Sequence, residues 1–222
     1  MARFILIALL ALASSNLYAQ FGVQVGYVYM PSNGNLRLGN PWGEFSGTTR
    51  NHGFNVGLTY EFRLRGHLGM QTAALYSFAG GRVRETRIID GLNNLPAVQL
   101  TVSRYQFLEL PVRVTYSLPV TNEFRFFFFG GPSFSYALSG RARSQLGNFF
   151  QFNNGEFYNV YEDFGDVLSP FELRVGGGLG VHYQNYRIRI GYDQGLLNLY
   201  NGTGRGKSLR RSQFSISFGY VF

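Results

Sequence analysis

Histidine and cysteine, two side chains often used in acid–base, nucleophilic or metal chemistry, are scarce in this chain. Cysteine is absent, so stability must come from packing and backbone hydrogen bonds rather than disulfides. The three histidines are His52, His67 and His182, and none begins a metal-ligand spacing such as His-Glu-x-x-His. The sequence therefore predicts no catalytic residues, no metal site and no cofactor, and a protein that is not an enzyme.

A glycine-rich segment and a net charge of +8 raise the question of phosphate or nucleic-acid binding. Residues 202–208 read Gly-Thr-Gly-Arg-Gly-Lys-Ser, but a phosphate loop would need glycine in place of Asn201 and a helix afterwards. We interpret the segment as a flexible loop with a basic tip. The Lys and Arg residues are spread singly, without a basic helix or clustered stripe, so no nucleic-acid partner is expected.

Many of the charged residues lie in segments whose apolar residues recur at every second position. This period is that of a β-strand, whose successive side chains point to opposite faces. In the last segment one face is wholly apolar, and the other is small and mostly polar. The segments are near or slightly above the roughly 9–11 residues that a tilted membrane strand needs. They are residues 21–30, 52–62, 67–80, 104–118, 124–138, 171–183, 186–197 and 213–222.

The connections between these segments alternate in length, which on an even strand count is typical of a bacterial outer-membrane barrel. A soluble sandwich or lipocalin-like barrel is the alternative. The apolar face, however, lacks charge in all eight segments, while the opposite face carries charge in five. We predict an all-β, eight-stranded antiparallel up-and-down transmembrane β-barrel in the outer membrane, with both termini periplasmic. Short turns are expected at 63–66, 119–123 and 184–185, and long loops at 31–51, 81–103, 139–170 and 198–211.

The beginning of the chain has the layout of an export signal. Arg3 precedes an apolar run at 4–13 that is too short to span a bilayer, and a plausible cleavage position follows Ala19. We expect a signal peptide at residues 1–19 and an outer-membrane β-barrel domain at residues 20–222. No continuous apolar run after residue 19 is long enough for a transmembrane helix.

In such a barrel, the charged residues of the polar face point into the lumen. An interior enclosed by eight strands is only wide enough to be filled by side chains. Four acids face five arginines there, and hydrogen-bonded pairing would nearly neutralise them. This lumen charge network is interpreted either as a plug of ion pairs that makes the barrel rigid or as a narrow polar conduit. Its members are Glu61, Glu109, Arg113, Arg125, Glu172, Arg174, Arg187, Arg189 and Asp193.

Aromatic residues of the apolar face fall at two levels, as the interfacial girdles of a membrane barrel do. The long-loop level contains Tyr27, Tyr29, Tyr76, Phe78, Phe134, Tyr136, Phe171, Tyr192 and Phe214. The short-turn level contains Tyr60, Phe62, Tyr116, Phe124, Tyr183, Tyr186, Tyr220 and Phe222. The last segment resembles the C-terminal signal that the barrel-assembly machinery reads, with Phe218, Tyr220 and Phe222 as the signal residues. Expected partners are that machinery, outer-membrane lipid and lipopolysaccharide.

Three motifs carry a resemblance to a known family. Leu-Glu-Leu-Pro at 108–111, Gly131–Tyr136 and Gly191–Leu199 are similar to the corresponding parts of the PorT-like outer-membrane β-barrel proteins. The resemblance covers essentially the whole mature chain and implies the barrel fold. Its founding member is tied to a protein-secretion system, which implies an accessory role in secretion or envelope assembly. Pro111 removes a ladder donor from a closed barrel, so a bulge or irregularity is expected at Leu110–Pro111.

The long loops hold the candidate recognition features. Residues 148–166 combine acidic and aromatic side chains, which is expected either of a partner site or of a lid over the barrel mouth. The basic residues of the outer end would meet lipopolysaccharide phosphates or be ordinary solvated charge. We predict loops that bind an envelope or secretion partner or a surface ligand, against a small-solute porin and, third, an enzyme acting on lipid A. The basic residues are Arg82, Arg84, Arg87, Arg205, Lys207, Arg210 and Arg211.

Overall fold

The computed structural model describes residues 19–37, 44–88, 96–147, 158–159, 161, 168–201 and 208–222. Nearly all of these residues are in strands or tight turns. Within them, no helix is long and apolar enough to cross a membrane. The strands are β1 (Ala19–Arg37), β2 (Glu44–Arg65), β3 (Leu68–Ile88), β4 (Pro96–Pro119), β5 (Phe124–Gly147), β6 (Tyr158–Asn159), β7 (Phe171–Tyr183), β8 (Tyr186–Gly195), β9 (Ser208–Arg211) and β10 (Gln213–Val221).

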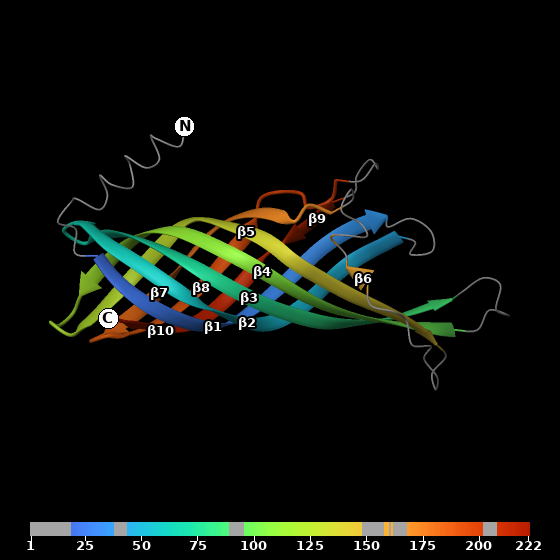
Figure 1. Ribbon diagram of the computed structural model, residues 1–222, viewed down its shortest axis with the longest axis horizontal. Helices are drawn as coiled ribbons and strands as arrows, with labels where there is room; N and C mark the ends of the chain where they lie inside the picture. The colour runs from blue at the N-terminus through green and yellow to red at the C-terminus, as the bar shows by residue number, and fades with distance from the viewer. Residues whose placement is uncertain are drawn as a thin grey trace.

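Eight of these strands form a closed antiparallel barrel (Figure 1). Each strand pairs with the next in the order β1, β2, β3, β4, β5, β7, β8 and β10, and β10 pairs back with β1 from Tyr29↔Phe214 to Gly22↔Val221. In the closed part of the barrel, no described strand therefore has a free edge, as the bilayer requires. The predicted fold class is confirmed. The end of β10 and the tight turns lie at one end of the barrel, which we call the short-turn end (Figure 1).

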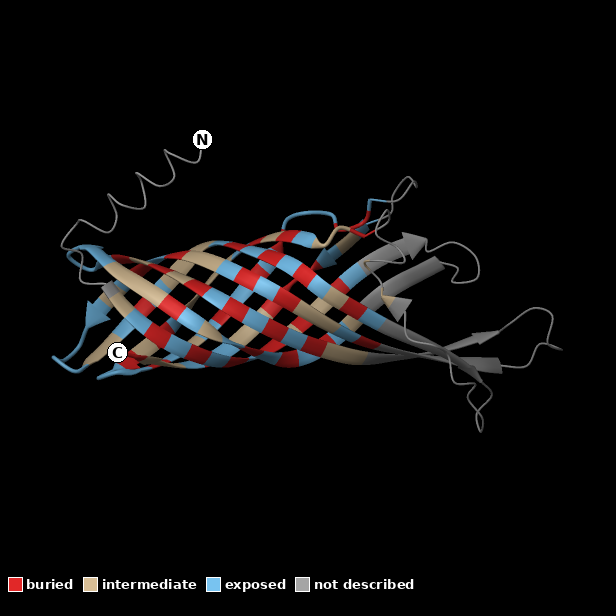
Figure 2. Cartoon of the chain, in the orientation of Figure 1, coloured by how far each residue is buried: buried red, intermediate tan, exposed pale blue. Residues whose placement is uncertain are grey.

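Burial alternates residue by residue along the strands, which gives the barrel surface a checkerboard of exposed and buried positions (Figure 2). On β2, for example, Leu58 is 64% exposed and its neighbour Thr59 is 7% exposed. The exposed set is apolar and the buried set is largely polar. This inverts the arrangement of a soluble barrel, because lipid rather than water covers the outside.

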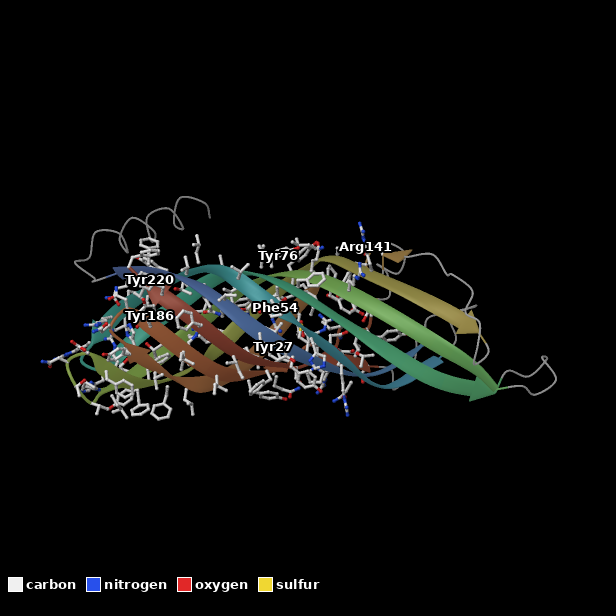
Figure 3. The ribbon with its side chains drawn as sticks, turned by 90° about the horizontal axis from the view of Figure 1, so that it is seen from below. Tyr27, Phe54, Tyr76, Arg141, Tyr186 and Tyr220 are labelled. Carbon is white, nitrogen blue, oxygen red and sulfur yellow. The ribbon has the colours of Figure 1, made fainter. Side chains whose placement is uncertain are left out.

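Aromatic rings cover parts of this outer surface (Figure 3). Tyr186 lies at the short-turn end, where its ring is 5.4 Å from that of Tyr220 between centroids. Tyr27 and Tyr76 lie farther toward the opposite end, and Tyr27 contacts Phe54 edge-on. Rings at two levels along the strands fit the two interfaces of a bilayer.

The strands extend well beyond the predicted segments. Seven stretches predicted as parts of long loops are strand: 31–37, 44–51, 81–88, 96–103, 139–147, 158–159 and 208–211. The pairing of β1 with β2 continues to Arg37↔Glu44, and that of β3 with β4 to Ile88↔Pro96. The predictions missed these extensions because alternation of apolar and polar residues weakens once neither face contacts lipid. β8, by contrast, ends at Gly195 rather than Leu197.

Strand pairing is irregular near Pro111. Between β3 and β4, pairs are formed at Thr72↔Val112 and Leu75↔Glu109 but not between them, and the register is the same on both sides. The expected irregularity at Leu110–Pro111 is therefore present without a register shift. A register shift does occur between β4 and β5, nearer the long-loop end. There Gln106 pairs with Ser139 and Phe107 pairs with Ala137, which leaves Leu138 as the extra residue of a bulge.

Candidate functional site

The lumen of the barrel is the candidate site, and all nine residues of the predicted charge network line it. Six of them are buried, and Glu61, Arg125 and Arg189 are intermediate in exposure. Their strand positions share the inward parity on β2, β4, β5, β7 and β8, so the period of two is sufficient to place them. Which residues pair with which depends on the stagger of the strands.

The middle of the lumen is closed by a hydrogen-bonded ion pair. Arg174 Nη2 lies 3.0 Å from Glu109 Oε2, and the two side chains are 1% and 3% exposed. Gln213 joins both residues: its Nε2 donates to Glu109 Oε2 at 3.3 Å, and its Oε1 accepts from Arg174 Nη1. The three side chains come from β7, β4 and β10, so they connect opposite walls. Burial of such a pair is tolerable because each charge has a partner.

Arg113 forms a second cross-lumen contact. Its Nη2 donates to Asp193 Oδ1 at 2.6 Å. Its Nη1 donates to the carbonyl oxygens of Gly131 and, at 3.4 Å, Gly176. Gly131 has a φ of 150°, a backbone conformation that favours glycine, and this turns its carbonyl out of the regular ladder. One guanidinium on β4 thus holds β5, β7 and β8.

Arg189 has no carboxylate partner among the described residues. It donates to Gln71 Oε1 at 2.6 Å and to Gln24 Oε1, and it lies over the Phe129 ring at 5.4 Å. A cavity of about 40 Å³ lies beside it, large enough for only a few water molecules. The lumen at this level is therefore a packed polar layer around one cation.

Two further arginines lie nearer the short-turn end. Arg187 pairs with Glu61 across the lumen and lies 5.1 Å from the centre of the Phe127 ring. Arg125 donates through Nε to Nδ1 of the buried His182 at 2.7 Å. His182 is therefore a hydrogen-bond acceptor within the wall. The inward rings of Phe127 and Phe129 were not expected from the sequence, since they belong to an uninterrupted run of phenylalanines.

Arg211 belongs to this network, although the sequence analysis assigned it to the basic outer surface. The residue is 5% exposed and faces the lumen from β9, which pairs with β1 above the barrel closure. Its Nη1 lies 3.5 Å from Glu172 Oε2, and its Nη2 lies 3.4 Å from the Tyr161 hydroxyl. Its guanidinium carbon is 4.7 Å from the centre of the Phe107 ring. The earlier assignment is wrong because β9 has four residues, too few to show alternation.

An apolar layer lies in the outer half of the lumen. Val28, Met30, Ala79, Phe107 and Ala137 are buried together, and Tyr161 packs against them. These inward apolar residues were also not expected, because the inner face was predicted from its polar members. Tyr161 comes from the connection between β5 and β7, and it further contacts Leu168. This residue therefore covers the apolar layer from the outer side.

The remaining predicted residues occupy varied positions. Within residues 148–166 only Tyr158, Asn159 and Tyr161 are described, and the first two pair with β5 as β6. Of the other outer basic residues only Arg210 has a described side chain, and it is exposed. Arg82, Arg84, Arg87, Arg205 and Lys207 fall outside the described side chains. Phe218 and Phe222 are exposed and Tyr220 is half-buried between them.

The histidines do not assemble into a site. His52 accepts or donates a hydrogen bond with the Tyr27 hydroxyl on the outer surface, and His67 lies in the β2–β3 turn beside Tyr116. His182 lies in the lower lumen, where it is hydrogen-bonded to Arg125. Across the described ranges, no three His, Asp or Glu side chains form a group that would hold a metal ion.

Comparison with protein families identifies the class of this barrel. The family described as outer membrane protein beta-barrel domain matches residues 12–201, which is most of the chain. The chain belongs to this family, and the protein is an integral outer-membrane β-barrel protein. The short-turn end is accordingly periplasmic and the long-loop end faces outward. No curated protein sequence matches the chain.

Several solved outer-membrane proteins are similar to this chain at low sequence identity. The attachment invasion locus protein Ail of Yersinia pestis is 15% identical, with a TM-score of 0.41, over 92% of this chain and 99% of Ail. Neisserial surface protein A is 14% identical, with a TM-score of 0.40, over 92% and 99%. The outer membrane protease OmpT from Escherichia coli is 10% identical, with a TM-score of 0.49, over 94% and 98%.

Proposed function

We propose that this protein is a PorT-like, non-enzymatic member of its family that binds an envelope or secretion partner, or a surface ligand, through its outer end. The observation that carries the proposal is the filled lumen. A barrel whose interior is closed by paired side chains is poorly suited to transport, so its function is expected on its surfaces. Lipopolysaccharide phosphates are a candidate ligand for the outer basic residues, of which Arg210 is exposed.

Successive layers support closure of the lumen. The Arg174–Glu109–Gln213 group crosses the middle, and Arg211 with Tyr161 crosses the outer half. The cavity at mid-height measures about 40 Å³. A small-solute porin, the competing function, needs a continuous aqueous path, and opening one here would separate buried charges from their partners.

The outer hairpins offer a binding platform. Among the described residues, β3 pairs only with β4 above Gly80, and β5 pairs only with β4 above Ala142. These three strands project beyond the closed part of the barrel (Figure 1). Unpaired strand edges present N–H and C=O groups that a partner can extend by strand addition. The aromatic and acidic residues of 148–166 adjoin this platform in the chain and add recognition chemistry.

Planar-bilayer recording of the purified, refolded barrel tests the choice between binding and transport. We expect no steady single-channel conductance, because the lumen is closed at several levels. Large, steady conductance would instead favour the porin. A pull-down from crosslinked envelopes, compared between the full chain and a variant lacking 81–103, then identifies the partner. Lipid A of unchanged mass with and without the protein is expected of a non-enzyme.

A further inference from the structure

A second site lies at the periplasmic end of the lumen, remote from the outer platform. A cavity of about 170 Å³ lies between the β2–β3 turn and the adjoining ends of β4 and β5. We call it the periplasmic cavity, and it is more than four times as large as the cavity at mid-height. Its lining includes Arg63, Arg125, Thr115, Gly69 and Glu61.

The charges around the periplasmic cavity do not balance. Within the described residues, neither Arg63 nor Arg125 forms a salt bridge with an acid, and Arg125 uses its Nε on His182. The acid in the lining, Glu61, is paired with Arg187. Two guanidinium groups therefore border one cavity without a carboxylate of their own. Guanidinium groups recognise carboxylate and phosphate oxygens by paired hydrogen bonds.

A buried hydroxyl in the lining also lacks a partner. Thr115 is 2% exposed, and its Oγ1 makes no hydrogen bond within the described residues. A buried polar atom without a partner is costly, so a ligand atom at this position would be stabilising. Gly69 lies directly against this hydroxyl: a Cβ there would lie 2.7 Å from Thr115 Oγ1 and 3.9 Å from Glu61 Oε1.

We propose that the periplasmic cavity binds a small soluble oxyanion of the phosphate class, held by Arg63, Arg125 and the Thr115 hydroxyl. The two cations supply the charge, and the hydroxyl supplies a directed donor. The cavity lies at the periplasmic mouth of the lumen, beside inward-facing side chains of β2, β4 and β5, whereas lipid headgroups surround the outside of the barrel. The source of the oxyanion is therefore the periplasmic solution, and the site does not depend on what binds the outer end.

Calorimetric titration with inorganic phosphate tests this site in the refolded full chain. The detergent should carry no phosphate, such as a maltoside, and ionic strength should be held constant with chloride. We expect saturable binding to one site. Arg63→Gln should weaken it about tenfold or more, as expected for loss of a charge-assisted hydrogen bond. Thr115→Val should weaken it with all charges retained.

Arg65→Gln is the matched control, because Arg65 is exposed in the same strand end and does not line the cavity. It should bind phosphate as the unmodified chain does. If Arg65→Gln and Arg63→Gln weaken phosphate binding equally, the binding is due to general surface charge and the proposal is wrong. The proposal is also wrong if titration with phosphate releases or absorbs no more heat than titration with chloride. Competition by phosphatidic acid in the micelle would reassign the site to a lipid headgroup. Arg63 is itself exposed, so loss of folding does not obscure these outcomes.

Discussion

At the scale of single residues, arginine is the side chain that closes this lumen. Its planar fork reaches across the barrel to an acid or amide on another strand, and its face rests on an aromatic ring. Arg187 on Phe127, Arg189 on Phe129 and Arg211 on Phe107 repeat this combination. A lysine would supply the charge without the fork or the stacking surface.

Arg211 gives a direct test of this view, since its neighbour Arg210 is exposed. Arg211→Gln removes the partner of Glu172 and the cation over Phe107. Loss of one member of a buried pair costs about 3–5 kcal/mol, whereas an exposed arginine contributes less than about 1 kcal/mol. On a gel, the folded barrel and the heat-unfolded chain migrate as separate bands. The temperature at which the folded band disappears should therefore be lower for Arg211→Gln than for the unmodified chain, and unchanged for Arg210→Gln. Equal stability of the two variants would mean that Arg211 is not in the lumen.

Strand parity predicts which charged residues face inward, but it does not predict which of them form pairs. Glu109 and Arg174 are 65 positions apart in the chain and meet because β4 and β7 both pair with β5, in a register that brings the two side chains together. Glu61 and Arg187 are likewise brought together by the closed cylinder. Parity is a local property of each strand, whereas pairing depends on strand tilt and register, which no short motif encodes.

At the scale of strands, the position of Gly131 illustrates how an irregularity is accommodated. Its φ of 150° and its place beside Val112 leave no room for a Cβ, while its carbonyl accepts from Arg113. Gly131→Ala should destabilise the barrel by about 1–3 kcal/mol, the usual cost of holding a non-glycine residue in such a region.

Gly130→Ala is the appropriate control, since a Cβ at Gly130 meets only the Gly176 carbonyl oxygen at 3.6 Å. Urea unfolding of the two variants in detergent should separate them by their midpoints. Equal midpoints would show that the backbone conformation at Gly131 does not make a side chain at this position destabilising.

Strand extents were the least predictable feature at this scale. Within the bilayer, lipid on one side and side chains on the other impose strict alternation, and β7 and β10 could be bounded from it within a residue. Beyond the bilayer, neither face of β3 and β4 has to be apolar, so the alternation is lost. Backbone pairing of the two strands nevertheless continues to Ile88↔Pro96. Hydrogen bonding between strands therefore persists after its sequence signal is lost.

At the scale of the whole molecule, closure of the lumen is distributed over several levels. The outer level contains Tyr161 and Phe107, and the middle level contains Arg174, Glu109 and Gln213. Tyr161→Ala combined with Phe107→Ala opens the outer level while leaving every middle contact in place. In planar bilayers this variant should conduct no more than the unmodified barrel, because an ion would still have to displace a buried, hydrogen-bonded charge pair. Steady conductance in the double variant would show instead that the outer level alone seals the barrel, and that a partner able to displace Tyr161 could open it.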